Sequence, residues 1–188
     1  MRSLTWALVA ISLVLAAPAA AQEEAAAPDG EAAPTGADAY TTQVQAGIAL
    51  LVAGDSQGAM AAFRQAMSSE PARPQAIFYL ATANRMAGSF QEAITGFERA
   101  ADNAEDLPRW RARALQAVAE TLERMEGQLE PARQAWQAYV RFADAHQAVA
   151  FPQIGRARIQ AIDVVIEQER AYVEVRRRIA EREARSDD

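Results

Sequence analysis

Residues 54–66 read GDSQGAMAAFRQA, and residues 88–100 read GSFQEAITGFERA. Four positions of the first segment recur 34 positions later in the second, and these pairs are Gly54 and Gly88, Ala59 and Ala93, Phe63 and Phe97, Ala66 and Ala100. A period of this length with small residues at fixed places is typical of stacked helical hairpins. Arrays of such hairpins generally present an extended surface to another molecule.

The repeated residues resemble the tetratricopeptide repeat family, whose unit is a pair of antiparallel helices. The first unit is expected at residues 39–73 and the second at residues 74–106. The resemblance implies that Gly47 and Ala59 are small residues at a helix crossing, where they allow the two backbones to approach closely. Gly54 is expected in the turn between the two helices.

A third, more divergent unit is expected at residues 110–145. Gly127, Ala132 and Trp136 keep the spacing of Gly54, Ala59 and Phe63, although Gly127 follows Gly88 by 39 positions instead of 34. About five residues must therefore be inserted, and we place them around Asp102 to Arg109.

The region from residue 152 to residue 188 is predicted to form one long helix. Its large apolar residues recur at steps near three and four, which indicates a helix with one buried face. The first half is apolar enough to cover the open end of the third hairpin, as the last helix of a solenoid must. A second interpretation, a coiled-coil homodimer formed through this helix, stays open. The fold class predicted is all-α, a short right-handed α-solenoid of about three hairpins plus a long C-terminal capping helix.

The N-terminal segment, residues 1–21, has the features of a secretory signal peptide. A basic Arg2 precedes a short apolar segment, and Ala19-Ala20-Ala21 supplies the small residues that a signal peptidase requires, so we expect cleavage after Ala21. Residues 22–38 contain Ala, Pro, Gly and acidic residues without a large apolar side chain, which predicts a disordered linker. The expected location is periplasmic or secreted.

Composition excludes several classes of protein. The chain of 188 residues has a formal net charge of −6, which gives no support for nucleic-acid binding. It contains no cysteine, so disulfides and thiolate sites are excluded. All its basic side chains other than one histidine are arginine, and with the alanine excess this indicates GC-rich codon usage and hence a bacterium.

The sequence contains no recognisable catalytic constellation. His146 is the single histidine, so a second imidazole for a metal site or a catalytic pair is missing. No nucleophile elbow, phosphate-binding loop or zinc-protease motif is present. We therefore expect no enzyme activity, no cofactor and no metal.

The candidate site is the inner face of the array, which the resemblance assigns to the first helix of each hairpin. Counting from the glycine turns predicts the partner-binding residues Val44, Ile48, Leu51, Phe78, Thr82, Arg85, Thr121 and Arg124, with Ala117 beside them. The apolar residues and two arginines would suit a peptide that carries acidic groups. The alternative is that some of these side chains are simply packed under the N-terminal segment or the last helix. Family members that grip a terminal carboxylate use Lys and Asn in this groove, and this chain has neither there.

The function predicted is an adaptor or scaffold of the bacterial cell envelope that binds a partner protein or peptide. The alternative is a structural homo-oligomer assembled through the C-terminal helix. Neither interpretation includes nucleic acid or a membrane span after signal cleavage.

Overall fold

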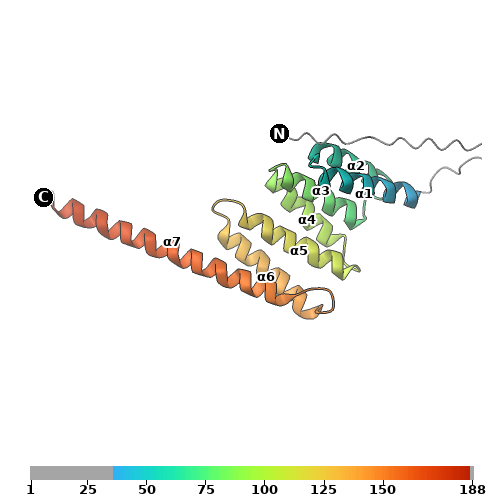
Figure 1. The fold of residues 1–188 in the computed structure, drawn as a ribbon. Coiled ribbons are helices and arrows are strands. Elements are labelled where there is room, and N and C mark those ends of the chain that lie inside the picture. Colours follow the sequence, from blue (N-terminus) through green and yellow to red (C-terminus); the bar gives the residue numbers. More distant parts are fainter. Residues whose placement is uncertain (1–35, 187–188) are drawn as a thin grey trace, which may run out of the picture. The chain divides into compact units, whose positions relative to one another are not determined.

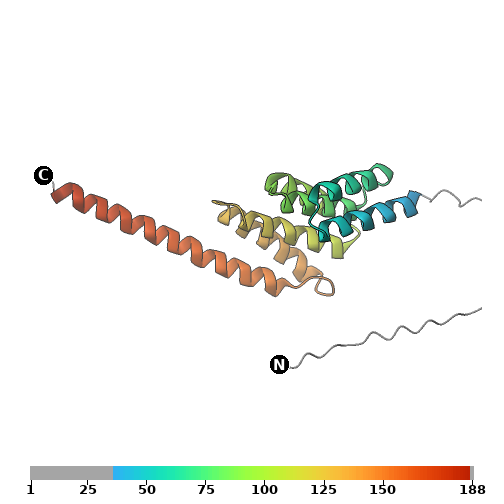
Figure 2. The same cartoon turned by 45° about the horizontal axis from the view of Figure 1, so that its top comes forward.

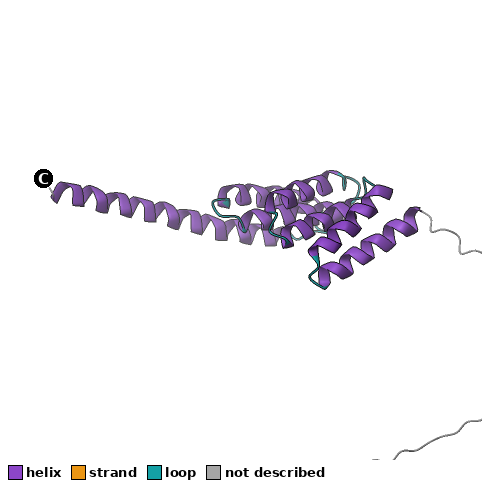
Figure 3. Cartoon of the chain, turned by 90° about the horizontal axis from the view of Figure 1, so that it is seen from above, coloured by secondary structure: helices purple, strands orange, loops and turns teal. Residues whose placement is uncertain are grey.

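The computed structural model describes residues 36–186, and this part of the chain is entirely helices and short connections (Figures 1 and 3). The helices in order are α1 (Gly36–Val52), α2 (Ser56–Ser69), α3 (Pro74–Met86), α4 (Phe90–Asp102), α5 (Pro108–Glu123), α6 (Leu129–Ala145) and α7 (Pro152–Ser186). The predicted signal peptide and residues 22–35 of the predicted linker lie outside the described residues.

Helices that follow one another in the chain pack against one another, from α1 on α2 through to α6 on α7. The helices α1–α2, α3–α4 and α5–α6 form three hairpins. The first helices of successive hairpins are also neighbours, since α1 contacts α3 and α3 contacts α5. The predicted all-α solenoid of three hairpins and a C-terminal helix is therefore confirmed (Figure 1).

The three glycines that suggested the repeat all occupy the turns. Gly54 and Gly88 have φ of 82° and Gly127 has φ of 72°, a backbone conformation that only glycine adopts without strain. In the first two turns the same hydrogen bond closes the helix, because the amide of Asp55 donates to the Leu50 carbonyl and that of Ser89 donates to the Asn84 carbonyl, both at 2.9 Å. The sequence period thus corresponds to a repeated turn geometry.

Close helix packing within a hairpin depends on small residues at the helix crossing. A Cβ atom added at Gly47 would lie 2.4 Å from Cε1 of Phe63, so only glycine fits beside this ring. In the second hairpin Ala81 and Gly96 form the close contact, and a Cβ atom at Gly96 would lie 2.7 Å from that of Ala81. The predicted close approach of the first two helices at Gly47 is confirmed.

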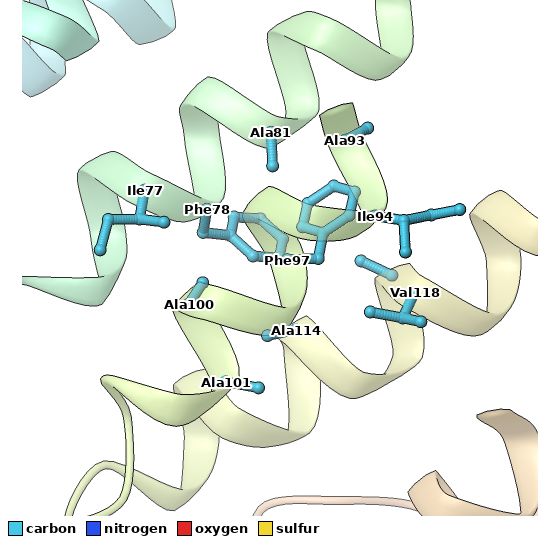
Figure 4. Packing of buried hydrophobic residues seen from close by; sticks show 11 residues of the cluster. Ile77, Phe78, Ala81, Ala93, Ile94, Phe97, Ala100, Ala101, Ala114 and Val118 are labelled. Atoms are coloured by element: carbon cyan, nitrogen blue, oxygen red, sulfur yellow. The ribbon is translucent and has the colours of Figure 1, made fainter. Parts of the chain in front are cut away.

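The core continues from one hairpin to the next. The rings of Phe78 in α3 and Phe97 in α4 lie 5.2 Å apart between centroids, and Figure 4 shows them pointing toward each other. Ala114 and Val118 of α5 belong to the same buried cluster. The hairpins therefore share one continuous apolar interior, as expected of a solenoid.

The inserted residues do not lie around Asp102 to Arg109, where we expected them. The distance along the chain from Gly54 to Pro74 equals that from Gly88 to Pro108, so the link from α4 to α5 has the standard length. The additional residues lengthen α5 and the turn after it, which spans 124–128 where the earlier turns span 53–55 and 87–89. Pro74 and Pro108 begin their helices, where proline lacks only an amide that would be unpaired anyway.

The N-terminal end of the array differs slightly from expectation, whereas the C-terminal end agrees with it. Helix α1 begins at Gly36, three residues before the expected start of the first unit, with Asp38 in its first turn. An acidic side chain at that position interacts favourably with the helix dipole. At the other end the first half of α7 packs on α6, with Gly155 against Tyr139 and Val140, and Ile162 and Ile166 buried. The first half of α7 thus covers the last hairpin.

Candidate protein-binding surface

The inner face of the array is the side of α1, α3 and α5 that turns away from the second helices of the hairpins. On α3, Ala76 and Ala83 pack toward α2, and Ala81 packs against Gly96 of α4. By helical periodicity the side left free carries Thr82 and Met86, and Tyr79 lies at its edge, where its ring stacks on Phe63 of α2. The equivalent residues of α1 and α5 lie one repeat period before and after these.

Three of the eight predicted binding residues are buried and do not present side chains to a partner. Leu51 packs among Ala59, Met60 and Phe63. Phe78 is 8% exposed because the ring of Trp110 lies 5.7 Å away from its own, and Thr121 is 0% exposed. The hydroxyl of Thr121 donates to the Ala117 carbonyl at 2.6 Å, so the polar group is satisfied inside the helix. These assignments to an open groove are wrong, since neighbouring helices cover the side chains.

The residues predicted on α5 were displaced by the position of the insertion. The prediction counted backwards from Gly127, and that count passes through the additional residues. Adding the repeat period to the residue numbers of α3 avoids them. It gives Gln116 and Glu120 as the residues of α5 that are equivalent to Thr82 and Met86. The packing agrees, because Ala114 and Ala117 belong to the cluster around α4.

The other predicted residues remain accessible in different degrees. Val44 and Ile48 of α1 are partly buried, as are Thr82 and Arg85 of α3, whereas Arg124 just after α5 is exposed. The Thr82 hydroxyl donates to the Phe78 carbonyl at 2.9 Å, which leaves its lone pairs available. The structure therefore keeps these five residues on or beside the inner face.

Two exposed apolar residues on this face were not predicted from the sequence. Val52 is 86% exposed and Met86 is 53% exposed, and each stands two positions before a turn glycine. Val52 continues the row of Val44 and Ile48, because residues four apart share one side of a helix. The two are separated by one repeat period, so the spacing that revealed the repeats could have identified them.

A salt bridge joins α3 and α5 across the inner face. The Arg85 Nη1 atom lies 3.4 Å from Glu120 Oε2, and the Gln116 amide donates to the other oxygen of Glu120 at 2.8 Å. Burial lowers the pKa of Arg85 while the charge of Glu120 opposes that shift. The Arg85 guanidinium also lies 5.2 Å from the Phe97 ring centroid. These contacts hold Arg85 in place and leave it little freedom to bind a partner.

Arg113 of α5 is the arginine best placed to meet an acidic partner. Its guanidinium lies 4.9 Å from the Trp110 ring centroid and 5.4 Å from that of Phe78. The side chain is exposed, and within residues 36–186 no carboxylate pairs with it. Stacking on aromatic rings fixes the guanidinium plane while its outer N–H groups stay free to donate.

The inner face ends at α7. The indole of Trp136 donates to Glu123, and Arg158 of α7 forms an ion pair with the same carboxylate. Ile154 and Arg124 line a shallow groove beside this junction. The third hairpin and α7 are therefore joined by polar contacts as well as apolar ones.

No feature of the described residues suggests a metal or membrane site. Within residues 36–186 no three His, Asp or Glu side chains come together as metal ligands would. The His146 ring stacks on Phe142 with centroids 4.1 Å apart, and its Nδ1 lies 2.9 Å from the Phe142 carbonyl oxygen. None of the helices described has the length and apolarity needed to cross a bilayer.

Comparison with solved structures places this arrangement among helical-repeat proteins. The N-terminal domain of stress-induced protein-1 (STI-1) from C. elegans matches with a TM-score of 0.60 and 14% identity, over 70% of this chain and 99% of that one. The fold is of the tetratricopeptide repeat type. The type III secretion translocator chaperone SycD of Yersinia enterocolitica matches with a TM-score of 0.54 and 13% identity, over 70% of this chain and 88% of that one. No family model and no curated protein sequence matches the chain.

Proposed function

We propose that this protein is a non-enzymatic adaptor of the bacterial cell envelope that binds a segment of a partner protein on its inner face. The observation that supports this most directly is the row of accessible apolar side chains on α1 and α3, in particular Val52 and Met86. Large apolar residues exposed at equivalent places of successive repeats indicate a surface that is covered in use.

The chemistry of the face indicates what kind of segment would fit. The part formed by α1 and α3 carries the exposed apolar side chains of Val52 and Met86, whereas α5 contributes the exposed guanidinium of Arg113. A partner segment would therefore place apolar side chains against Val52 and Met86 and a carboxylate near Arg113. SycD, which shares the fold, is a chaperone of secretion translocators by its name, and this relation to protein handling is consistent with an adaptor role.

The envelope location rests on residues 1–21, which have the order of a cleavable signal. Fractionation of the native cell, with N-terminal sequencing of the protein recovered, tests it. A mature chain that begins at Gln22 in the periplasmic fraction supports the proposal, whereas an uncleaved chain in the cytoplasm contradicts it.

Site-specific cross-linking tests the binding face. A photoreactive amino acid at Val52 or at Met86 should form an adduct with one partner protein, identified by mass spectrometry, in native cells. The same amino acid at Thr95, which is exposed on α4, is the matched control. Adduct formation should be lost when the other inner-face position is changed to Asp, and Leu107→Asp, at an exposed apolar residue elsewhere, should leave it unchanged. Equal adducts from Thr95, or none from the inner face, would refute the proposal.

A further inference from the structure

The second half of α7, residues 167–185, is called the arm, and it extends beyond the hairpins (Figures 1 and 2). Its side chains are exposed apart from that of Glu174, which is partly buried. Large apolar residues are nevertheless concentrated on and just before it: Val164, Val165, Tyr172, Val173, Val175 and Ile179, each 41–65% exposed. Such a concentration on a solvated helix indicates that another surface covers it.

Some of these residues form a stripe distinct from the one that α6 covers. The α6-facing side of α7 carries Gly155, Ile162 and Ile166. At 100° per residue, the line through Val165, Tyr172 and Ile179 lies about 100° around the helix from that side. Val175 and Gln168 stand between them at steps of three and four, the spacing of a coiled-coil seam. A second helix can therefore pack on this stripe without displacing α6.

We propose that the stripe packs against the same stripe of a second copy of this chain, with the two arms antiparallel. In that arrangement Tyr172 of each copy faces Val175 of the other. The paired segment 165–182 spans about 27 Å at 1.5 Å per residue. This inference does not depend on the proposed function of the inner face.

The charges that border the stripe select the second copy and its direction. Glu169 and Arg176 lie on the same edge, one heptad apart, and neither has an ion-pair partner within residues 36–186. Antiparallel packing brings Glu169 of each copy to Arg176 of the other, so both unpaired charges are satisfied twice by symmetry.

Parallel packing does not pair Glu169 with Arg176. It would place Glu169 opposite Val164 of the other copy and Arg176 opposite Ala171, so both charges would stay unpaired. It would also bring Arg182 directly against Arg182 in the seam, where like charges repel. In the antiparallel arrangement Arg182 meets Val165, and its aliphatic stem can cover that side chain.

Sedimentation velocity of the purified protein over a range of concentrations tests the proposal. We expect a mass of two chains that falls to one chain on dilution. Glu169→Arg and Arg176→Glu should each weaken the dimer roughly tenfold, because each replaces two attractive pairs with two repulsive ones. The double variant should restore the dimer. Glu167→Arg, with the same charge change on another side of the helix, should behave as the unchanged protein.

A monomer at all concentrations, or a dimer that Glu169→Arg does not weaken, would overturn the proposal. Helicity measured by circular dichroism for every variant shows whether a loss of dimer comes from a loss of fold. Association of the arm with a different protein instead would appear as a monomeric purified chain, which also overturns it.

The absence of cysteine allows a test of direction without background. Chains with Gln168→Cys alone should not cross-link to one another, because antiparallel packing separates the two thiols by about 16 Å along the helix axis. Mixed with Ile179→Cys chains under oxidation, they should form the mixed disulfide. Efficient cross-linking of Gln168→Cys with itself would establish parallel packing and overturn the assignment.

Discussion

The hairpin array and the arm are both helical, but different forces hold their helices. In the array each aromatic residue at the repeated position is enclosed, as Phe63, Phe97 and Trp136 are each no more than 1% exposed. In the arm no side chain is fully buried, and most of its ion pairs lie within the helix, such as those of Glu174 with Arg177 and Arg178. The helices of the array are therefore stabilised by tertiary packing, whereas the helix of the arm is stabilised by interactions within itself.

This difference determines what each region can do. Interlocked side chains make the array a rigid support, which suits a surface whose residues must hold fixed positions. A helix with few tertiary contacts is stabilised mainly by exposed pairs worth about a few tenths of a kcal/mol each, which leaves it sensitive to a second molecule that packs on it. Substitutions that act on one kind of stabilisation only should therefore separate the two regions.

The largest effect is expected from removing an aromatic ring of the array. Phe97→Ala should lower the free energy of unfolding by about 3–5 kcal/mol, because the ring is fully enclosed between α3, α4 and α5. Tyr172→Ala in the arm, measured at a dilution where the protein is monomeric, should change it by less than about 0.5 kcal/mol. Urea denaturation followed by circular dichroism measures both. Similar losses for the two variants would show that the arm is part of the cooperative core.

A smaller effect is expected where the two regions respond to opposite substitutions. Glycine to alanine normally favours a helix, yet Gly47→Ala should cost the array about 1–3 kcal/mol, because the new methyl group would overlap the Phe63 ring. Ala171→Gly should reduce the helicity of the arm and leave the unfolding midpoint of the array unchanged. Thermal denaturation monitored by circular dichroism compares them.

A second substitution separates overlap from other causes at Gly47. The double variant Gly47→Ala/Phe63→Leu should lose less stability than the sum of the losses of the two single variants. If the two losses simply add, the methyl group and the ring do not interact, and the overlap is not the cause of the loss.

The repeats could be predicted from the sequence because backbone geometry restricts which residue types can occupy the repeated positions. Gly54, Gly88 and Gly127 occur where the backbone needs a positive φ, and no other residue type satisfies that requirement as well. The position of the insertion could also have been found, because Pro74 and Pro108 begin equivalent helices exactly one repeat period apart. The residues predicted on α5 were counted from Gly127 alone and were therefore in the wrong register.

The environment of individual side chains could not be predicted in the same way. Phe78 packs on Phe97 within its own hairpin, and Trp110 of the next hairpin also lies against its ring. Periodicity specifies which side of a helix a residue occupies, but the size of its neighbours decides whether it is accessible. The candidate surface therefore shifted toward Val52 and Met86, which no neighbour covers.

The smallest effect is expected from pH, and it should act on the arm. Hydrogen bonds from Arg177 and Arg178 lower the pKa of Glu174 from 4.5 to about 2. A carboxyl group whose pKa is lower in the folded state stabilises the fold above its ordinary pKa and loses that contribution as the pH falls toward the lowered value. The arm should therefore lose helicity between about pH 4.5 and pH 2, and the carbon resonance of the Glu174 carboxyl group should titrate near the lower end of this range.

Glu174→Gln is the matched control, since the amide keeps the shape of the side chain and cannot titrate. Its arm should be less helical than that of the unchanged protein at pH 7, and the two should converge near pH 2, where the Glu174 carboxyl group gains its proton. Because the pairs are exposed to solvent, added salt at pH 7 should reduce the difference as acid does. If Glu174 titrates near its ordinary pKa, or if both arms lose helicity equally, ion pairs along the helix do not hold the arm, and only association with another helix would remain to explain its length.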